Sequence, residues 1–141
     1  VYSFDSSPEI DVLIIPGGYG AEEIEIHNRV LLDWIKKMSL KVQVTASVCT
    51  GAFLLAEAGV ISEHVVTTHW MDLSRLQPGY PKLKVVGNRK FVDQGNILTA
   101  AGISSGIELS LYLVKKFCGS SVAENTARRM EYSGDLSGII Y

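Results

Sequence analysis

One short apolar run near the start of the chain limits the folds that this sequence can adopt. Asp11-Val12-Leu13-Ile14-Ile15 is almost entirely apolar, and Pro16-Gly17-Gly18-Tyr19-Gly20 stops it at once. A strand that is apolar on both faces belongs inside a parallel sheet that helices cover on either side. The run therefore predicts an α/β fold of three layers with a mainly parallel sheet.

The rest of the chain alternates strands and helices, as such a fold requires. A helix is predicted near Asn28–Met38, with Asn28 as its N-cap. Its predicted apolar stripe consists of Val30, Leu31, Trp34, Ile35 and Met38. The other predicted elements are, in order, a strand at Lys41–Val48, a helix at Thr50–Ala58, a strand at Val65–His69, a helical turn at Trp70–Leu76, a loop at Gln77–Pro81, strands at Lys84–Val86, Lys90–Asp93 and Ile97–Ala100, and helices ending at Phe117 and spanning roughly Ser121–Glu131.

The bulk composition narrows the function classes. With 141 residues, 47% hydrophobic and 20% charged, the sequence predicts one globular domain over residues 1–141. The net charge is -2 and no basic cluster exceeds Arg128-Arg129, which argues against a nucleic-acid partner. No apolar run is long enough for a membrane span. Two distant cysteines without metal-ligand spacing favour a reducing compartment, so a cytoplasmic location is expected.

The stretch Val44–Ala52 is the strongest candidate for chemistry. It predicts a strand that ends at Cys49 and passes through Thr50 and Gly51 into a helix. A sulfur at such a turn projects above the carboxyl edge of the sheet, beside a helix N-terminus that favours the thiolate. A buried structural cysteine is the alternative, but the turn parallels the nucleophile turn of α/β hydrolases. Cys118, at the end of an amphipathic helix, is interpreted as structural.

Two further features are expected at the same edge. Backbone N–H groups of Gly17 and Gly18 follow a buried strand and are candidates for an oxyanion pocket, although a tight turn explains one glycine. His69 ends a predicted strand and is a candidate base or hydrogen-bond donor, or else a structural histidine. His27 and His64 are expected at the surface.

The stretch Gly102–Gly106 opens the long predicted helix. Ser104 or Ser105 is expected to cap that helix and to share in lining the pocket. Glu22 and Glu23 follow the glycine-rich loop and are interpreted as solvated charges at a helix start.

Taken together, these motifs resemble the ThiJ/PfpI superfamily, which has the class I glutamine-amidotransferase-like fold. The segments that carry the resemblance are Asp11–Gly18, Ser47–Ala52, Thr67–Trp70 and Asp93–Gly102. Their order matches through essentially the whole chain. The variant Ser-Val-Cys-Thr-Gly with Thr-Thr-His-Trp is most similar to isocyanide hydratase-like proteins and to the sensor domains of AraC-type regulators.

The resemblance implies a flavodoxin-like sandwich, a homodimer, and no required metal or organic cofactor. It implies that Cys49 is the nucleophile, that Thr50 and Gly51 belong to its pocket, that the Gly18 N–H holds an oxyanion or water, and that His69 lies close by. It also places an acidic residue before the strand at Asp11, upstream of Val1. The chain is therefore expected to lack an N-terminal strand and helix that the native protein has.

Two classes of function follow from the resemblance. The first is a cysteine-dependent enzyme acting on a small molecule, by hydration of an isonitrile or by amidase, protease-like or glyoxalase-like chemistry. The second is a ligand-sensing domain without catalysis. An oxidative-stress role, in which Cys49 becomes a sulfinate, is compatible with the first class.

Overall fold

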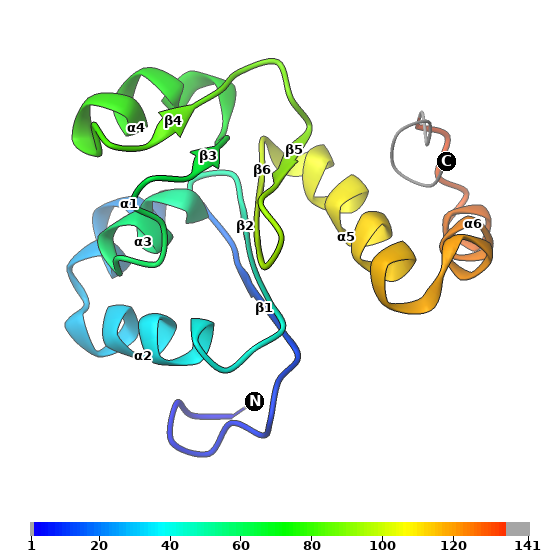
Figure 1. The fold of residues 1–141 in the computed structure, drawn as a ribbon, viewed down its shortest axis with the longest axis horizontal. Helices are drawn as coiled ribbons and strands as arrows, with labels where there is room; N and C mark the ends of the chain where they lie inside the picture. The colour runs from blue at the N-terminus through cyan, green and yellow to red at the C-terminus, as the bar shows by residue number, and fades with distance from the viewer. Residues whose placement is uncertain (1, 135–141) are drawn as a thin grey trace.

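The computed structural model describes residues 2–134, so residue 1 and residues 135–141 of the predicted domain lie outside it (Figure 1). Its main sheet has the strand order β1-β2-β6-β5. These strands are β1 (Val12–Ile15), β2 (Val44–Val48), β5 (Phe91–Asp93) and β6 (Ile97–Ala100). Strands β1, β2 and β6 are parallel, and β5 pairs antiparallel with β6 as the predicted hairpin.

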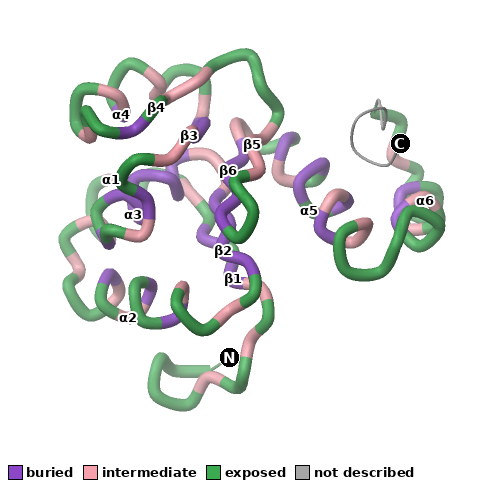
Figure 2. The backbone as a smooth tube through the Cα atoms, in the orientation of Figure 1, coloured by how far each residue is buried: buried purple, intermediate pink, exposed green. Residues whose placement is uncertain are grey.

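Helices cover both faces of this sheet, which confirms the predicted three layers (Figure 1). On one face, Leu13 and Ile15 of β1 pack with α2 (Arg29–Ser39) and α3 (Gly51–Glu57). On the other face, Val44 and Ala46 of β2 pack with α5 (Ile103–Cys118). Helix α6 (Ser120–Arg129) packs against α5. The buried segments run through β2, β6 and the inner sides of these helices (Figure 2).

A second, two-stranded sheet was not expected. It pairs β3 (Val65–Val66) in parallel with β4 (Lys84–Val85), and it carries the 3-10 helix η2 (Trp70–Asp72) and helix α4 (Leu73–Gly79). The interpretation of Val65–His69 as a strand of the main sheet was therefore wrong. Side chains rather than a strand ladder join this segment to the main sheet, because the Thr67 N–H donates to the Thr99 hydroxyl at 2.9 Å.

Several boundaries differ from the predictions because tertiary contacts outweigh local propensity. Asn28 caps α2 as predicted, accepting from the Leu31 N–H at 3.2 Å, but Val30 is 68% exposed and Leu32 takes its place in the core. The predicted loop at Gln77–Pro81 is helical as far as Gly79. Glu22 and Glu23 are the last two residues of helix α1 (Tyr19–Glu23), which begins earlier than the predicted helix start, and the 3-10 helix η1 (Glu25–His27) was not predicted.

The start of α5 also differs. Gly102 is the N-cap residue, and no side chain caps the helix, so neither Ser104 nor Ser105 has the predicted capping role.

Within residues 2–134, no helix is both long and apolar enough to cross a bilayer. At the outer edge of the main sheet, β1 leaves Ile14 43% exposed.

Candidate functional site

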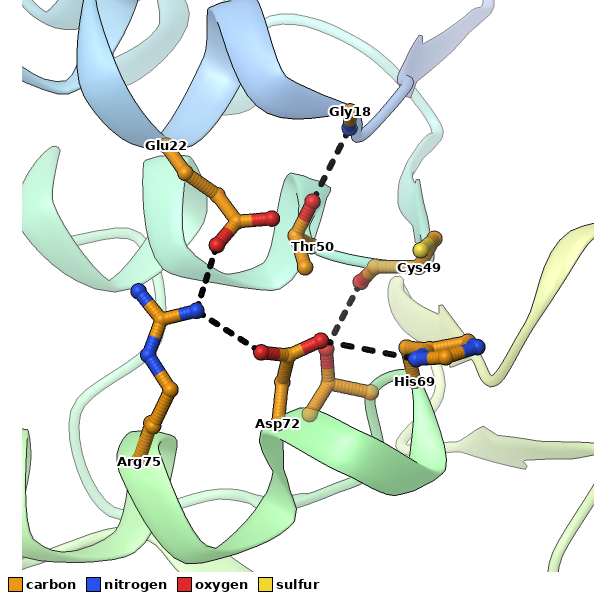
Figure 3. A network of polar contacts seen from close by, with 8 residues as sticks. Gly18, Glu22, Cys49, Thr50, His69, Asp72 and Arg75 are labelled. Atoms are coloured by element: carbon orange, nitrogen blue, oxygen red, sulfur yellow. Dashed lines mark hydrogen bonds and ion pairs between the residues drawn. The ribbon is translucent and has the colours of Figure 1, made fainter.

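Cys49 lies at a sharp turn between β2 and α3, with a left-handed backbone at φ 57°. A residue other than glycine adopts this conformation only where its surroundings enforce it. Here the Cys49 N–H points to the carbonyls of Ala100 (3.1 Å) and Ala101 (2.8 Å), and the Cys49 carbonyl accepts from the Thr68 hydroxyl at 2.8 Å. Within residues 2–134, the sulfur has no hydrogen-bond partner, and it projects away from the network in Figure 3. The turn therefore holds a half-buried, unpaired thiol in a fixed position.

Close backbone approach explains the two glycines nearest to this turn. A Cβ at Gly17 would lie 2.5 Å from the Thr50 nitrogen, and a Cβ at Gly51 would overlap the carbonyl oxygen of Ile15. The loop after β1 and the first residues of α3 are thus packed directly against each other. This contact fixes the glycine-rich loop beside Cys49.

The N–H of Gly18, predicted as an oxyanion donor, already donates to the Thr50 hydroxyl at 2.9 Å (Figure 3). Thr50 is 1% exposed, so it joins the two loops from inside rather than lining an open pocket. An oxyanion role for Gly18 stays a prediction, and it requires this hydrogen bond to be exchanged for one to the substrate. Gly18 itself has φ 120°, which explains why a glycine is needed there.

His69 precedes η2, and its imidazole is part of an ion-pair network (Figure 3). The Nδ1 atom lies 3.5 Å from Oδ2 of Asp72, and the two side chains are 26% and 13% exposed. The opposite side of the ring faces Gly102, where an added Cβ would lie 3.1 Å from Cδ2 of His69. The absence of a side chain at Gly102 therefore makes room for the imidazole near the start of α5.

Arg75 extends this network to the glycine-rich loop. Its Nη1 atom lies 2.6 Å from Oε2 of Glu22 and 2.8 Å from Oδ1 of Asp72. The hydrogen bond that Arg75 donates to Glu22, and then the one that it donates to Asp72, raise the pKa of Arg75 above its ordinary value. Glu22 is therefore paired and 16% exposed, which corrects its interpretation as a solvated charge.

Sequence reasoning missed Asp72 and Arg75. Their signal was the three-residue spacing from His69 to Asp72 and from Asp72 to Arg75, which places the three side chains on one face of a helical turn. The pairing with Glu22 joins residues far apart in the sequence, and no local pattern indicates it.

The other candidate residues lie apart from this network. Ser104 is exposed on α5, whereas Ser105 is buried, and the pocket role of Ser104 stays a prediction. Cys118 is exposed, which does not fit a packed structural cysteine. His27 is exposed and His64 half-buried. Among residues 2–134, no cluster of three or more His, Cys, Asp or Glu side chains could hold a metal ion.

Comparisons with known sequences give a consistent result. The sequence model of the DJ-1/PfpI family matches residues 2–116. The chain is 30% identical to an isonitrile hydratase of Pseudomonas putida over 132 residues, which cover 93% of this chain and 56% of that protein. It is 29% identical to the HTH-type transcriptional regulator CdhR of Pseudomonas aeruginosa, covering 80% of this chain and 33% of the regulator. The chain thus spans about half or less of these relatives' length.

Solved structures give the same result as the sequence comparisons. A ThiJ/PfpI family protein from Pseudomonas syringae superposes with a TM-score of 0.84 at 25% identity, covering 94% of this chain and 54% of that one. An AraC family transcriptional regulator from Pseudomonas putida superposes with a TM-score of 0.72 at 23% identity, covering 86% of this chain and 64% of the regulator. The second likeness shows a shared fold.

Proposed function

Because this chain belongs to the DJ-1/PfpI family, we propose that it is an enzyme that uses Cys49 as a nucleophile on a small molecule. The observation that carries the proposal is the turn at Cys49. A left-handed backbone is costly for cysteine, by about 1–3 kcal/mol. Hydrogen bonds of the Cys49 N–H to two carbonyls and of the Thr68 hydroxyl to the Cys49 carbonyl maintain it while leaving the sulfur unpaired. A packed structural cysteine would need no such turn.

We propose hydration of an isonitrile as the reaction, which the similarity to the isonitrile hydratase supports. The Cys49 thiolate forms a C–S bond with the terminal carbon of the isonitrile, and that carbon takes up a proton to give a thioimidate. Water then adds to the same carbon, and the C–S bond breaks to release the thiolate and an N-substituted formamide. One water is consumed in total, and the protons taken up and released balance.

His69 is the proposed group for moving these protons. With Nδ1 facing Asp72, a proton on that nitrogen leaves Nε2 free to accept one. Asp72 then orients the imidazole and stabilises its protonated form, while Arg75 holds Asp72 in place. The Gly18 N–H is the proposed oxyanion donor once substrate displaces the Thr50 hydroxyl.

The first experiment measures alkylation of Cys49 at pH 7 by mass spectrometry, with Cys118 of the same molecule as the control. A nucleophilic Cys49 is expected to react at least about ten times faster than the more exposed Cys118. Incubation with cyclohexyl isocyanide should then produce the formamide, and Cys49→Ala should abolish its formation. Equal alkylation rates, or full turnover by Cys49→Ala, would refute the proposal.

The second candidate is a ligand-sensing domain without turnover. The similarity to the regulator CdhR and the engagement of the Gly18 N–H by Thr50 favour it. The same Cys49→Ala variant separates the two candidates. A sensor should still bind its ligand when Cys49 is replaced, whereas an enzyme that uses Cys49 as its nucleophile should lose turnover. The homodimer, the cytoplasmic location and the lack of a cofactor stay predictions from the resemblance and composition.

A further inference from the structure

A cavity of about 280 Å³ lies beside the Cys49 turn, between the start of η2, the chain segment before β5 and the first turn of α5. A larger cavity of about 610 Å³ lies between the N-terminal segment and α2, and its lining includes none of the candidate catalytic residues. The volume of the smaller cavity fits a substituent of a small molecule.

This smaller cavity shares its wall with the Cys49 turn. Thr68 and Ala101 both line it, and both hydrogen-bond to the backbone of Cys49. The cavity therefore lies next to the backbone of Cys49. Trp70 and Leu73 form an apolar part of the lining.

The polar part of the lining contains an unpaired hydroxyl. Ser105 is 8% exposed and lines the cavity, and its hydroxyl makes no hydrogen bond within residues 2–134. Among the described residues, the hydroxyls shielded from solvent without a partner are those of Thr45 and Ser47, so the Ser105 hydroxyl is open to the cavity and is available to a polar group there.

The charged side chains that line the cavity are all positive. Arg89 and Lys90 both line the cavity, and no carboxylate does. Lys90 also pairs with the buried carboxylate of Glu108 and is largely committed to it. The Arg89 side chain is exposed and enters no ion pair in the part of the chain described here. The neighbouring Asn88 has a left-handed backbone at φ 54°, within the turn that presents Arg89.

We propose that this cavity binds a carboxylate on the substrate, with Arg89 and the Ser105 hydroxyl as its ligands and Trp70 against the apolar part. The inference rests on Cys49 being the reacting group, and it names the substrate class as small molecules that carry a carboxylate near the reactive carbon. Arg89 is a specificity residue in this arrangement, because it selects the substrate and takes no part in bond breaking.

The test compares two probes of similar size, one anionic and one neutral. Cys49 is alkylated with 3-maleimidopropionate and, separately, with neutral N-propylmaleimide, and mass spectrometry gives the ratio of the two rates at Cys49 and at Cys118. The ratio at Cys49 is expected to exceed that at Cys118 by about three- to tenfold. It should fall as ionic strength rises, because salt screens exposed charges.

Four variants test which residues cause the preference of Cys49 for the anionic probe. Arg89→Gln should reduce the Cys49 ratio to the Cys118 value, and Ser105→Ala should reduce it partly. Arg89→Lys keeps the charge and should retain most of the preference. Lys84→Gln removes an exposed cation from β4, away from the cavity lining, and should leave the ratio unchanged.

The outcomes separate this inference from the proposed function. A fast-reacting Cys49 whose ratio equals that of Cys118, or is the same in Arg89→Gln and Lys84→Gln, would overturn the carboxylate site and leave the nucleophile intact. A Cys49 that reacts no faster than Cys118 with either probe would overturn both.

Discussion

Two regions of this molecule are rich in polar contacts and use them in different ways. The first, here called the catalytic edge, comprises residues 17–22, 49–51 and 68–75. The second, here called the α5 anchor, comprises Lys90, Asp93, Glu108, Tyr112, Lys116 and Tyr132. In the catalytic edge, hydrogen bonds to the backbone fix a thiol that is itself unpaired. In the α5 anchor, every one of these groups has a polar partner.

The α5 anchor ties β5 and α6 to the long helix α5. Asp93 accepts from the Tyr112 hydroxyl at 2.6 Å and lies 3.3 Å from Nζ of Lys116. Burial alone would raise the pKa of Asp93, but the hydrogen bonds from Tyr112, the Gly95 N–H and Lys116 hold it below its ordinary value. Glu108 accepts from the Tyr132 hydroxyl at 2.8 Å. A dense polar cluster of this kind stabilises the fold, whereas chemistry needs one group left without a partner.

The largest effect is expected where the backbones of the catalytic edge touch. Gly51→Ala should lower the free energy of unfolding by about 3 kcal/mol or more, because its Cβ would overlap the Ile15 carbonyl. Urea denaturation measures this change. Gly20→Ala is the matched control, since nothing lies within 4 Å of a Cβ there, and it should be neutral or slightly stabilising. Equal stability of the two variants would contradict this packing.

The next effect tests the α5 anchor. Glu108→Gln should lower the free energy of unfolding by about 2 kcal/mol, because Glu108 is 5% exposed and Lys90 would lose its charged partner. The Cys49 alkylation rate should not change. Glu63→Gln, in the exposed pair with Lys82, should change stability by less than about 0.5 kcal/mol. A loss of Cys49 reactivity in Glu108→Gln would mean that the two regions are coupled.

Asp72→Asn tests the ionisable part of the catalytic edge. The turnover number should fall about tenfold with little change in KM, because His69 loses the anion that orients and stabilises its protonated ring. The free energy of unfolding should fall by less than about 1 kcal/mol, since Arg75 keeps Glu22. Asp33→Asn, on the exposed side of α2, is the control. Unchanged turnover would remove Asp72 from the mechanism.

The smallest effect concerns pH. Tyr112→Phe should lower the free energy of unfolding by about 1 kcal/mol at pH 7. The hydrogen bond to Asp93 raises the pKa of Tyr112 to about 12, so its stabilisation is present below the ordinary pKa of about 10 and is lost as the pH rises towards 12. The lowered pKa of Asp93 acts oppositely, and its stabilisation is lost as the pH falls through about 4 and below.

Urea titrations of Tyr112→Phe and the parent protein between pH 3 and pH 11 measure this difference. The gap in stability should be widest at neutral pH and should narrow towards both extremes. A constant gap across the range would mean that the Tyr112 hydroxyl stabilises the fold by something other than its hydrogen bond to Asp93.

Local patterns were sufficient for most of the fold. The apolar run Val12–Ile15, the N-cap Asn28 and the hairpin at Asp93–Asn96 each have short-range signals, and all are present. The pairing of β3 with β4 has no such signal, because each strand is only two residues long. The capping of α5 was wrong because Gly102 begins the helix with no side-chain hydrogen bond.

The candidate site likewise has features that local sequence patterns indicate and features that only tertiary contacts fix. The position of Cys49 between a strand and a helix follows from the residues around it, but its left-handed backbone does not, since only tertiary hydrogen bonds enforce it. The contact between Arg75 and Glu22 bridges 53 positions of sequence. Interactions of this range depend on the folded arrangement, and a single sequence does not reveal them.

The hydrogen bond from Thr68 to Cys49 has a consequence for motion. Together with the bond between Thr67 and Thr99, it joins the two sheets, with the thiol on one side and His69, Asp72 and Arg75 on the other. The site thus lies where two separately hydrogen-bonded sheets meet. An opening between the two sheets would separate the segment of His69 from the Cys49 turn without unfolding either sheet, so the amide of Thr67 should exchange with solvent before those of β2 do. The rate at which the two sheets separate and close, rather than the rigidity of the Cys49 turn, then determines how often the two parts of the site are in contact.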